Sequence, residues 1–112
     1  MSFLSSLFRK NDASGNKKQR IKIARELHGQ AIKYVTERRN DNDDVIGRGG
    51  SLTLRGEEFL VFSSGEIIMR TNAGEMDASY LMSGDGVVIT APNLDEGGTV
   101  HTIIAHFVYY RK

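Results

Sequence analysis

Three histidines are the side chains of this 112-residue chain best suited to proton transfer or metal binding. His28 falls on the apolar side of a predicted helix, a position typical of a core contact. His101 and His106 lie five residues apart in a predicted strand, so they point to opposite faces of the sheet and form no ligand pair. Catalysis by either histidine would require a pocket that it lines together with an acid.

Serines and acids give no complete catalytic or metal-binding motif. No serine lies in a Gly-x-Ser-x-Gly turn, and the absence of cysteine excludes a thiolate nucleophile and cysteine-ligated zinc. Glu57 and Glu58 are adjacent, so their side chains diverge, and the segment from Asp41 to Asp44 lacks the later ligands of a calcium loop. We therefore expect a protein that is not an enzyme and that has no cofactor and no metal.

Basic residues concentrate in the first third of the chain. Residues 1–39 carry ten lysines and arginines against three acids, a net charge of +7, whereas residues 40–112 have a net charge of −6. Such a cationic segment suits a polyanion, either nucleic acid or an anionic membrane surface. The candidate polyanion-binding residues are Lys17, Lys18, Arg20, Lys22 and Arg25.

Two other interpretations of these charges stay open. The basic helix and the acidic sheet can face each other, within one domain or across a dimer. The cations can also hold the N-terminus weakly against a membrane, together with the apolar side chains Phe3, Leu4, Leu7 and Phe8. No nucleic-acid recognition motif accompanies the cations, so nucleic acid is not the favoured partner.

The periodicity predicts one long helix from Lys17 to Arg39. Apolar residues recur on one face with helical spacing, and Asn16 and Asn40 are suited to its two ends. Its length of roughly 35 Å, at about 1.5 Å per residue, would cross a whole small sheet. Residues 1–16 form a flexible amphipathic segment and linker, and residues 17–112 form one domain.

Strand patterns dominate the rest of the chain. The predicted strands are Ser51–Arg55, Glu58–Ser63, Glu66–Thr71, Val87–Ala91 and Thr99–Arg111. The segments between residues 40 and 50 are interpreted as a connector, and Asp77 is expected to cap one or two helical turns before Met82.

Two of these strands are apolar on both faces, which one covering helix does not explain. We therefore expect the sheet to curl into a partly open barrel, or a second copy to cover its other face. The candidate interface residues are Phe59, Val61, Phe107 and Tyr109.

The composition, 39% apolar and 26% charged, is that of a folded protein, and no apolar run approaches the ~20 residues of a membrane-spanning helix. We predict an α+β fold with one long N-terminal amphipathic helix on an antiparallel, strongly curved sheet of about five strands. The N-terminus lacks the features of a secretory signal, so a cytoplasmic location is expected. The expected function is a non-catalytic interaction module that acts through self-association or a protein partner, with polyanion binding as the alternative.

Overall fold

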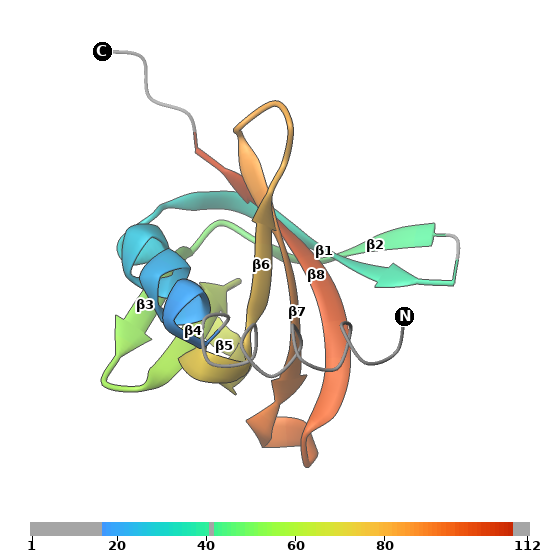
Figure 1. Ribbon diagram of the computed structural model, residues 1–112. Helices are drawn as coiled ribbons and strands as arrows, with labels where there is room; N and C mark the ends of the chain where they lie inside the picture. The colour runs from blue at the N-terminus through green and yellow to red at the C-terminus, as the bar shows by residue number, and fades with distance from the viewer. Residues whose placement is uncertain (1–16, 41, 109–112) are drawn as a thin grey trace, which may run out of the picture.

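A short helix at residues 17–27 precedes eight strands in the computed structural model, which describes residues 17–40 and 42–108 (Figure 1). Two 3-10 helices, η1 (Ala73–Glu75) and η2 (Leu94–Glu96), interrupt the strands. The strands are β1 (Ile32–Arg39), β2 (Asn42–Arg48), β3 (Ser51–Arg55), β4 (Glu58–Ser63), β5 (Glu66–Asn72), β6 (Asp77–Tyr80), β7 (Gly86–Asn93) and β8 (Thr99–Phe107).

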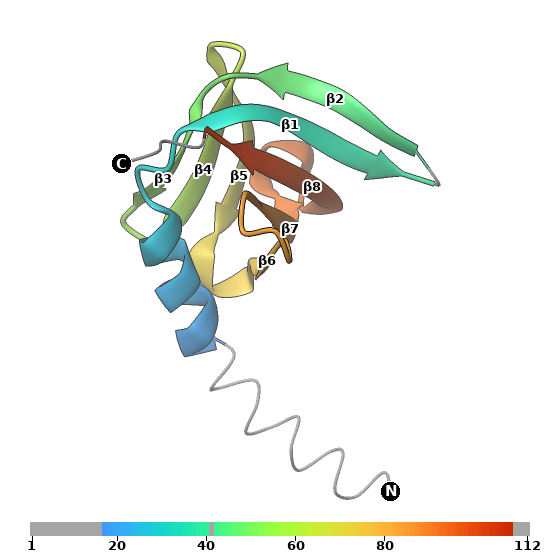
Figure 2. The ribbon, with the colours of Figure 1, turned by 90° about the horizontal axis from the view of Figure 1, so that it is seen from above.

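The strands form two antiparallel sheets and not a closed barrel. The larger sheet has the order β2-β1-β8-β7-β6, and the smaller one has the order β3-β4-β5. A single bridge between Ala31 and Ser51 links the start of β1 to the start of β3. Figure 2 shows the smaller sheet facing the larger one, with the helix at the side of the pair. The α+β class with antiparallel pairing is therefore confirmed, whereas the single sheet of about five strands is wrong.

The prediction of a long helix is wrong beyond Leu27. Gly29 has a φ of 88°, a left-handed conformation that ends helices. Its backbone N–H donates to the carbonyl of Leu52 in β3 at 2.8 Å, and the N–H of Leu52 donates back to Gln30 at 2.9 Å. Strand pairing therefore replaces the helical hydrogen bonds from this point on. No helix within residues 17–40 and 42–108 is long and apolar enough to cross a membrane.

The apolar residues after Gly29 belong to β1, which lies between β2 and β8. Tyr34, Val35 and Thr36 are aromatic or β-branched and favour a strand. Register irregularities on both sides of β1 shift its buried positions, so Ile32 and Val35 are both buried although they are three residues apart. Residues three apart also lie on one face of a helix, so this spacing in the sequence fits a helix as well as the observed strand.

Two further segments differ from the prediction. Residues 42–48, expected to be part of a connector, form β2, and Asn40, with a φ of 54°, lies in the turn between β1 and β2. The segment at Asp77, expected to be helical, forms β6 and pairs with β7. Both strands take their hydrogen bonds from a neighbouring strand of the larger sheet, which a local capping pattern does not reveal.

The hydrophobic core fills the space between the two sheets. It includes Val35 of β1, Leu52 of β3, Phe59 of β4 and Ile89 of β7, all fully buried. The helix adds Leu27 to this core. The helix and the residue that follows it contact both sheets: Glu26 of the helix accepts a hydrogen bond from the Tyr80 hydroxyl, and His28, just beyond the helix, accepts one from the N–H of Leu54. The helix therefore spans from β6 to β3.

Glycines form the corner where the chain passes from β2 to β3. Gly50 has a φ of 120°, and a Cβ atom there would overlap the backbone carbonyl of Phe62 in β4. Its own carbonyl accepts a hydrogen bond from the N–H of Ile32 at 3.0 Å. The glycine stretch is thus needed for close backbone contact between the sheets.

Candidate functional site

The predicted polyanion-binding residues occupy three different environments on the helix. Arg20 is committed to the protein, since its guanidinium lies 3.1 Å from Asp77 and also donates to the carbonyl of Gly74. Lys18 and Lys22 are exposed. Lys17 and Arg25 line a pocket. The expected pairing of the basic helix with the acidic sheet is thus represented by one ion pair, Arg20–Asp77, within the part of the chain described.

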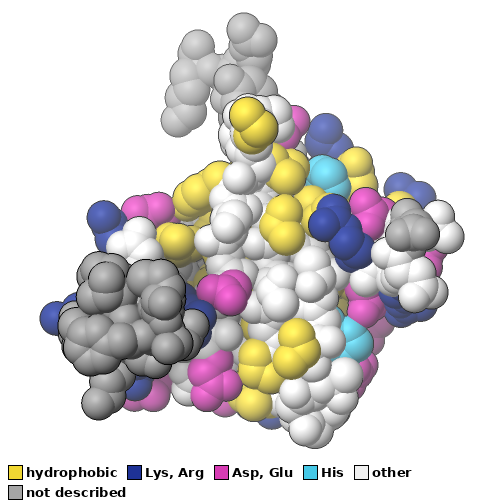
Figure 3. Space-filling view, turned by 45° about the vertical axis from the view of Figure 1, so that its right-hand side comes forward, with side chains coloured by type: hydrophobic (Ala, Val, Ile, Leu, Met, Phe, Trp, Pro, Cys, Tyr) yellow, Lys and Arg dark blue, Asp and Glu magenta, His cyan; other side chains and the backbone are white. Residues whose placement is uncertain are grey.

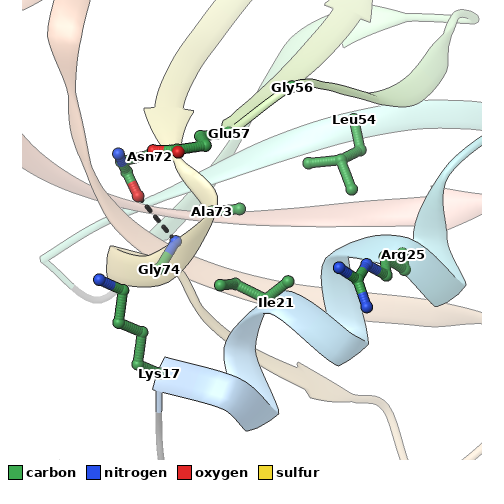
Figure 4. Close-up of a pocket in the computed structure, with 9 residues that line it drawn as sticks. All are labelled: Lys17, Ile21, Arg25, Leu54, Gly56, Glu57, Asn72, Ala73 and Gly74. Carbon is green, nitrogen blue, oxygen red and sulfur yellow. Dashed lines mark hydrogen bonds between the residues drawn. The ribbon is translucent and has the colours of Figure 1, made fainter. Parts of the chain in front are cut away.

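This pocket has a volume of about 280 Å³ and lies between the helix, the β3–β4 turn and the start of η1 (Figure 4). Its wall is apolar where Ile21 of the helix and Leu54 of β3 approach Ala73. Three segments that are far apart in the sequence supply the lining: Lys17, Ile21 and Arg25; Leu54, Gly56 and Glu57; and Asn72, Ala73 and Gly74.

The charged groups of the pocket are unevenly distributed. Figure 4 shows the Lys17 side chain beside Gly74, at the same side as Asn72 and Glu57, whereas the Arg25 guanidinium lies at the opposite side. Asn72 is held in place because its Oδ1 accepts the N–H of Gly74 at 2.9 Å. Within residues 17–40 and 42–108, neither Arg25 nor Glu57 takes part in an ion pair.

A second surface is the outer face of the larger sheet, on the side away from the core. Figure 3 shows mainly neutral and hydrophobic side chains over β6, β7 and β8, with charged side chains gathered at the margins. The Thr90 and Thr102 hydroxyls lie 3.0 Å apart, which places both on this face. Val100 is 63% exposed beside its pairing partner Pro92. We call this surface the neutral sheet face; its members are Thr36, Val88, Thr90, Pro92, Val100, Thr102 and Ile104, of which Thr36 and Ile104 are buried and the other five are exposed or half-buried.

The predicted interface residues lie inside the protein. Phe59 and Val61 are fully buried in the core and Phe107 is almost so, and Tyr109 lies outside the described residues. Phe59, Val61 and Phe107 belong to the core of their own chain and present almost no surface to a second one. The residues of the membrane-contact prediction, Phe3, Leu4, Leu7 and Phe8, also lie outside the described residues.

An arginine explains the second apolar face of β4. Leu60 is buried on the side opposite the core, and Arg70 of β5 is its direct cross-strand partner. The Arg70 guanidinium lies 2.7 Å from Glu58 and 3.1 Å from Asp95 of η2. This ion-pair network holds the arginine side chain beside Leu60. For β4, a side chain of the same chain thus lies beside the second apolar face, which we attribute from the sequence to a curled sheet or a second copy; within the described residues, the outer face of β8 has no such neighbour from β5.

His101 meets the condition set for a catalytic histidine only in part. It lines a small pocket of about 30 Å³ together with Glu37 and Glu96. Its Nδ1 and Nε2 atoms each lie 2.5 Å from one of these carboxylates, so both ring nitrogens are occupied. The hydrogen bond to Glu37 is the main cause that raises the pKa of His101, against a smaller lowering by burial. The space holds about one water molecule, and an imidazolium clamped in this way is a structural ion pair.

The other two histidines make structural contacts. His106 stacks on Tyr34 with ring centroids 4.2 Å apart. His28 lies beyond the helix end, where its Nδ1 accepts the backbone N–H of Leu54. Within residues 17–40 and 42–108, no group of three or more His, Cys, Asp or Glu side chains is arranged so that it could hold a metal ion. Asp43 and Asp44 instead face Arg38 and Arg39 across the β1–β2 hairpin.

Comparison with protein-family models, with curated proteins and with solved structures gave no match to this chain. The functional assignment therefore rests on the surfaces described above. Sequence patterns singled out Lys17 and Arg25, and they missed Ile21, Leu54 and Asn72 as neighbours of these cations. Only the β3–β4 turn and η1 bring these residues to the helix, and no local spacing predicts that.

Proposed function

We propose that this protein is a non-catalytic interaction module that self-associates through the neutral sheet face. The observation that carries the proposal is that the side chains of this face on β1, β8 and β7 are uncharged between Arg38 and Asp77, with Val100 largely exposed and Val88 half-buried. A self-complementary contact places each side chain near a copy of itself or of a neighbour. A face without charge avoids the like-charge contacts that such an arrangement brings.

Two charged residues at the margins fit this pairing. Thr90 pairs with Thr102 on one side and with Asp77 on the other. Arg38 of β1, one residue beyond the Glu37–Ile103 pair, continues this row, and its own partner Asp43 of the edge strand β2 ends it. Suppose that the sheets of two copies stack face to face, with a two-fold axis between them and parallel to the strands. The order of residues across the strands is then reversed in the second copy. Arg38 of each copy then lies opposite Asp77 of the other, so opposite charges meet at both margins, although each of these residues also has an ion-pair partner in its own chain, Asp43 for Arg38 and Arg20 for Asp77.

The size of the face sets the expected strength. Strands are about 4.8 Å apart and rise about 3.3 Å per residue, so three strands with about six residues each cover roughly 15 Å by 20 Å, or about 300 Å² per copy. Two copies would bury roughly 600 Å² in total, which is below the range of stable specific interfaces. We therefore expect a weak, reversible dimer that forms only at high protein concentration, and no permanent assembly.

Sedimentation velocity over a concentration series tests the proposal. The wild type should shift from monomer to dimer, and Val100→Lys should remain monomeric because it places a charge in the contact. Val100 is exposed, so the substitution leaves the core intact. The matched control is Ile67→Lys, which adds the same charge at an exposed position of β5 in the other sheet. A wild type that stays monomeric at high concentration, or a Val100→Lys variant that still dimerises, would rule the proposal out.

Polyanion binding by the helix is the alternative, and it rests on fewer side chains than the sequence predicted. Lys18 and Lys22 are exposed, whereas Arg20 is paired with Asp77. Salt-dependent binding to single-stranded DNA or to anionic vesicles, lost in the Lys18→Gln/Lys22→Gln variant, would support it. No binding at low salt would remove it.

A further inference from the structure

The pocket beside the helix is separate from the neutral sheet face, and its chemistry indicates a different kind of partner. Its volume of about 280 Å³ is near the lower limit of small-molecule sites, which is roughly 300 Å³. A ligand of amino-acid size fits such a space, whereas a nucleotide is too large. The three segments that build it are joined by hydrogen bonds, from the N–H of Ala73 to the carbonyl of Glu57 at 2.8 Å and from Arg20 to Gly74.

The pocket has an apolar wall with a cation at one side. Ile21 and Leu54 are partly exposed to it, and both also pack against the core. Figure 4 shows the Arg25 guanidinium at the side of the pocket next to these two residues. Because Arg25 has no acidic partner within the described residues, its planar donor groups are free for a carboxylate.

The opposite side of the pocket argues against a highly charged anion. Glu57 lies there with Asn72 and Lys17, so the charges at that side are of both signs. A phosphate or a polyanion that fills the pocket would meet the Glu57 carboxylate. A ligand with one negative charge and a hydrocarbon body avoids this contact and uses the apolar wall.

We propose that the pocket binds a small apolar carboxylic acid, whose carboxylate pairs with Arg25 and whose hydrocarbon body lies on Ile21 and Leu54. The acid is either a simple branched-chain carboxylate or an apolar amino acid. In the second case the ammonium group lies toward Glu57 and Asn72. Both share the carboxylate and the branched apolar chain, and they differ only at the Glu57 side of the pocket.

A methyl-detected NMR titration of the full chain with isocaproate, isocaproamide and L-leucine tests this assignment. Isocaproate should shift the methyl signals of Ile21, Leu54 and Ala73 in a saturable way at millimolar concentration. The neutral amide has nearly the same shape and should bind roughly tenfold more weakly or worse, because it loses the charge-assisted pair with Arg25. Tighter binding of L-leucine than of isocaproate identifies an amino acid as the ligand class, and weaker binding identifies a simple carboxylate.

Two variants of exposed helix residues complete the test. Arg25→Gln should remove the preference for isocaproate over isocaproamide, whereas Lys22→Gln, which removes a charge outside the pocket lining, should retain it. Backbone spectra of both variants report that the fold is intact. The proposal is overturned if neither acid causes saturable shifts at these methyl groups, or if Arg25→Gln binds isocaproate as tightly as the wild type. Neither result bears on dimerisation through the sheet face.

Discussion

The Nδ1 atom of His101 lies 2.5 Å from a carboxylate oxygen of Glu37, and its Nε2 atom lies 2.5 Å from Glu96. This arrangement links β8 to β1 and to η2. Glu37 is held further by Arg39, 3.0 Å away on its own strand. Burial raises the pKa of Glu37, but the hydrogen bonds from His101 and Arg39 outweigh it, so the net pKa is lowered.

Stability should fall as the pH rises above neutrality because of this histidine. The folded-state pKa of His101 is raised, so its stabilising effect is fully present below the unfolded value of about 6.5 and is lost as the pH rises through the folded value. We expect a loss of about 1 kcal/mol or less, because the side chain keeps some contact with solvent. Urea denaturation from about pH 5.5 to about pH 8.5 measures it.

His101→Gln is the control for that series, since it cannot carry the charge. Its free energy of unfolding should vary less with pH over this range. The lowered pKa of Glu37 makes stability depend on pH in the acidic range. The stabilising contribution of this carboxylate is fully present above about pH 4.5 and is lost as the pH falls through the folded-state pKa. If wild type and His101→Gln lose the same free energy of unfolding between about pH 5.5 and about pH 8.5, His101 is not the source of the loss.

Gly50→Ala should be far more damaging than the same change at Gly65. Both glycines have positive φ, but a Cβ at Gly50 overlaps the backbone of Phe62, whereas a Cβ at Gly65 meets open space. We expect a loss of about 3 kcal/mol or more at Gly50, from backbone displacement, and about 1–2 kcal/mol at Gly65, from conformation alone. Urea denaturation, or the yield of soluble protein if Gly50→Ala does not fold, checks the difference. Equal losses would contradict the close contact at this corner.

A charge exchange should distinguish a contact between two copies from one within a chain. Arg38→Glu and Asp77→Lys should each weaken dimerisation several-fold, because each places like charges opposite one another at both margins of the contact. Each change also reverses an exposed ion pair within the chain, Arg38–Asp43 or Arg20–Asp77, so the free energy of unfolding of each variant is measured alongside. The double variant restores opposite charges and should recover much of the affinity. Sedimentation velocity measures all three. A double variant that dimerises no better than the single ones would exclude the proposed orientation.

Local patterns predicted the central hairpin well. The bounds of β3 and β4 agree with the predicted strands residue for residue, because alternating or continuous apolar residues are bounded by a glycine turn at Gly56. The prediction of a long helix was wrong because the spacing of apolar residues after Gly29 fits two structures equally well. Pairing with β8, about seventy residues later, selects the strand.

The binding surfaces were harder to predict for the same reason. The basic residues of the helix were identified, but only the fold shows that Arg20 is engaged by Asp77 and that Arg25 is not paired within the described residues. The neutral sheet face is built from alternate residues of β1, β8 and β7, whose register depends on pairing. The sequence patterns place most of its members in predicted strands, Thr36 in the predicted long helix and Pro92 in a connection, and they favour the fully buried Phe59 as a contact residue.

The β1–β2 hairpin ends in an outer edge that no other described strand pairs with. An exposed edge offers backbone donors and acceptors to any extended chain, and unlimited strand addition leads to fibres. β2 carries Asp43 and Asp44 near its free end. An incoming strand would meet these charged side chains, and charge on an edge strand disfavours such pairing. Growth of this protein into linear polymers is thereby discouraged, while stacking of two sheet faces ends after two copies.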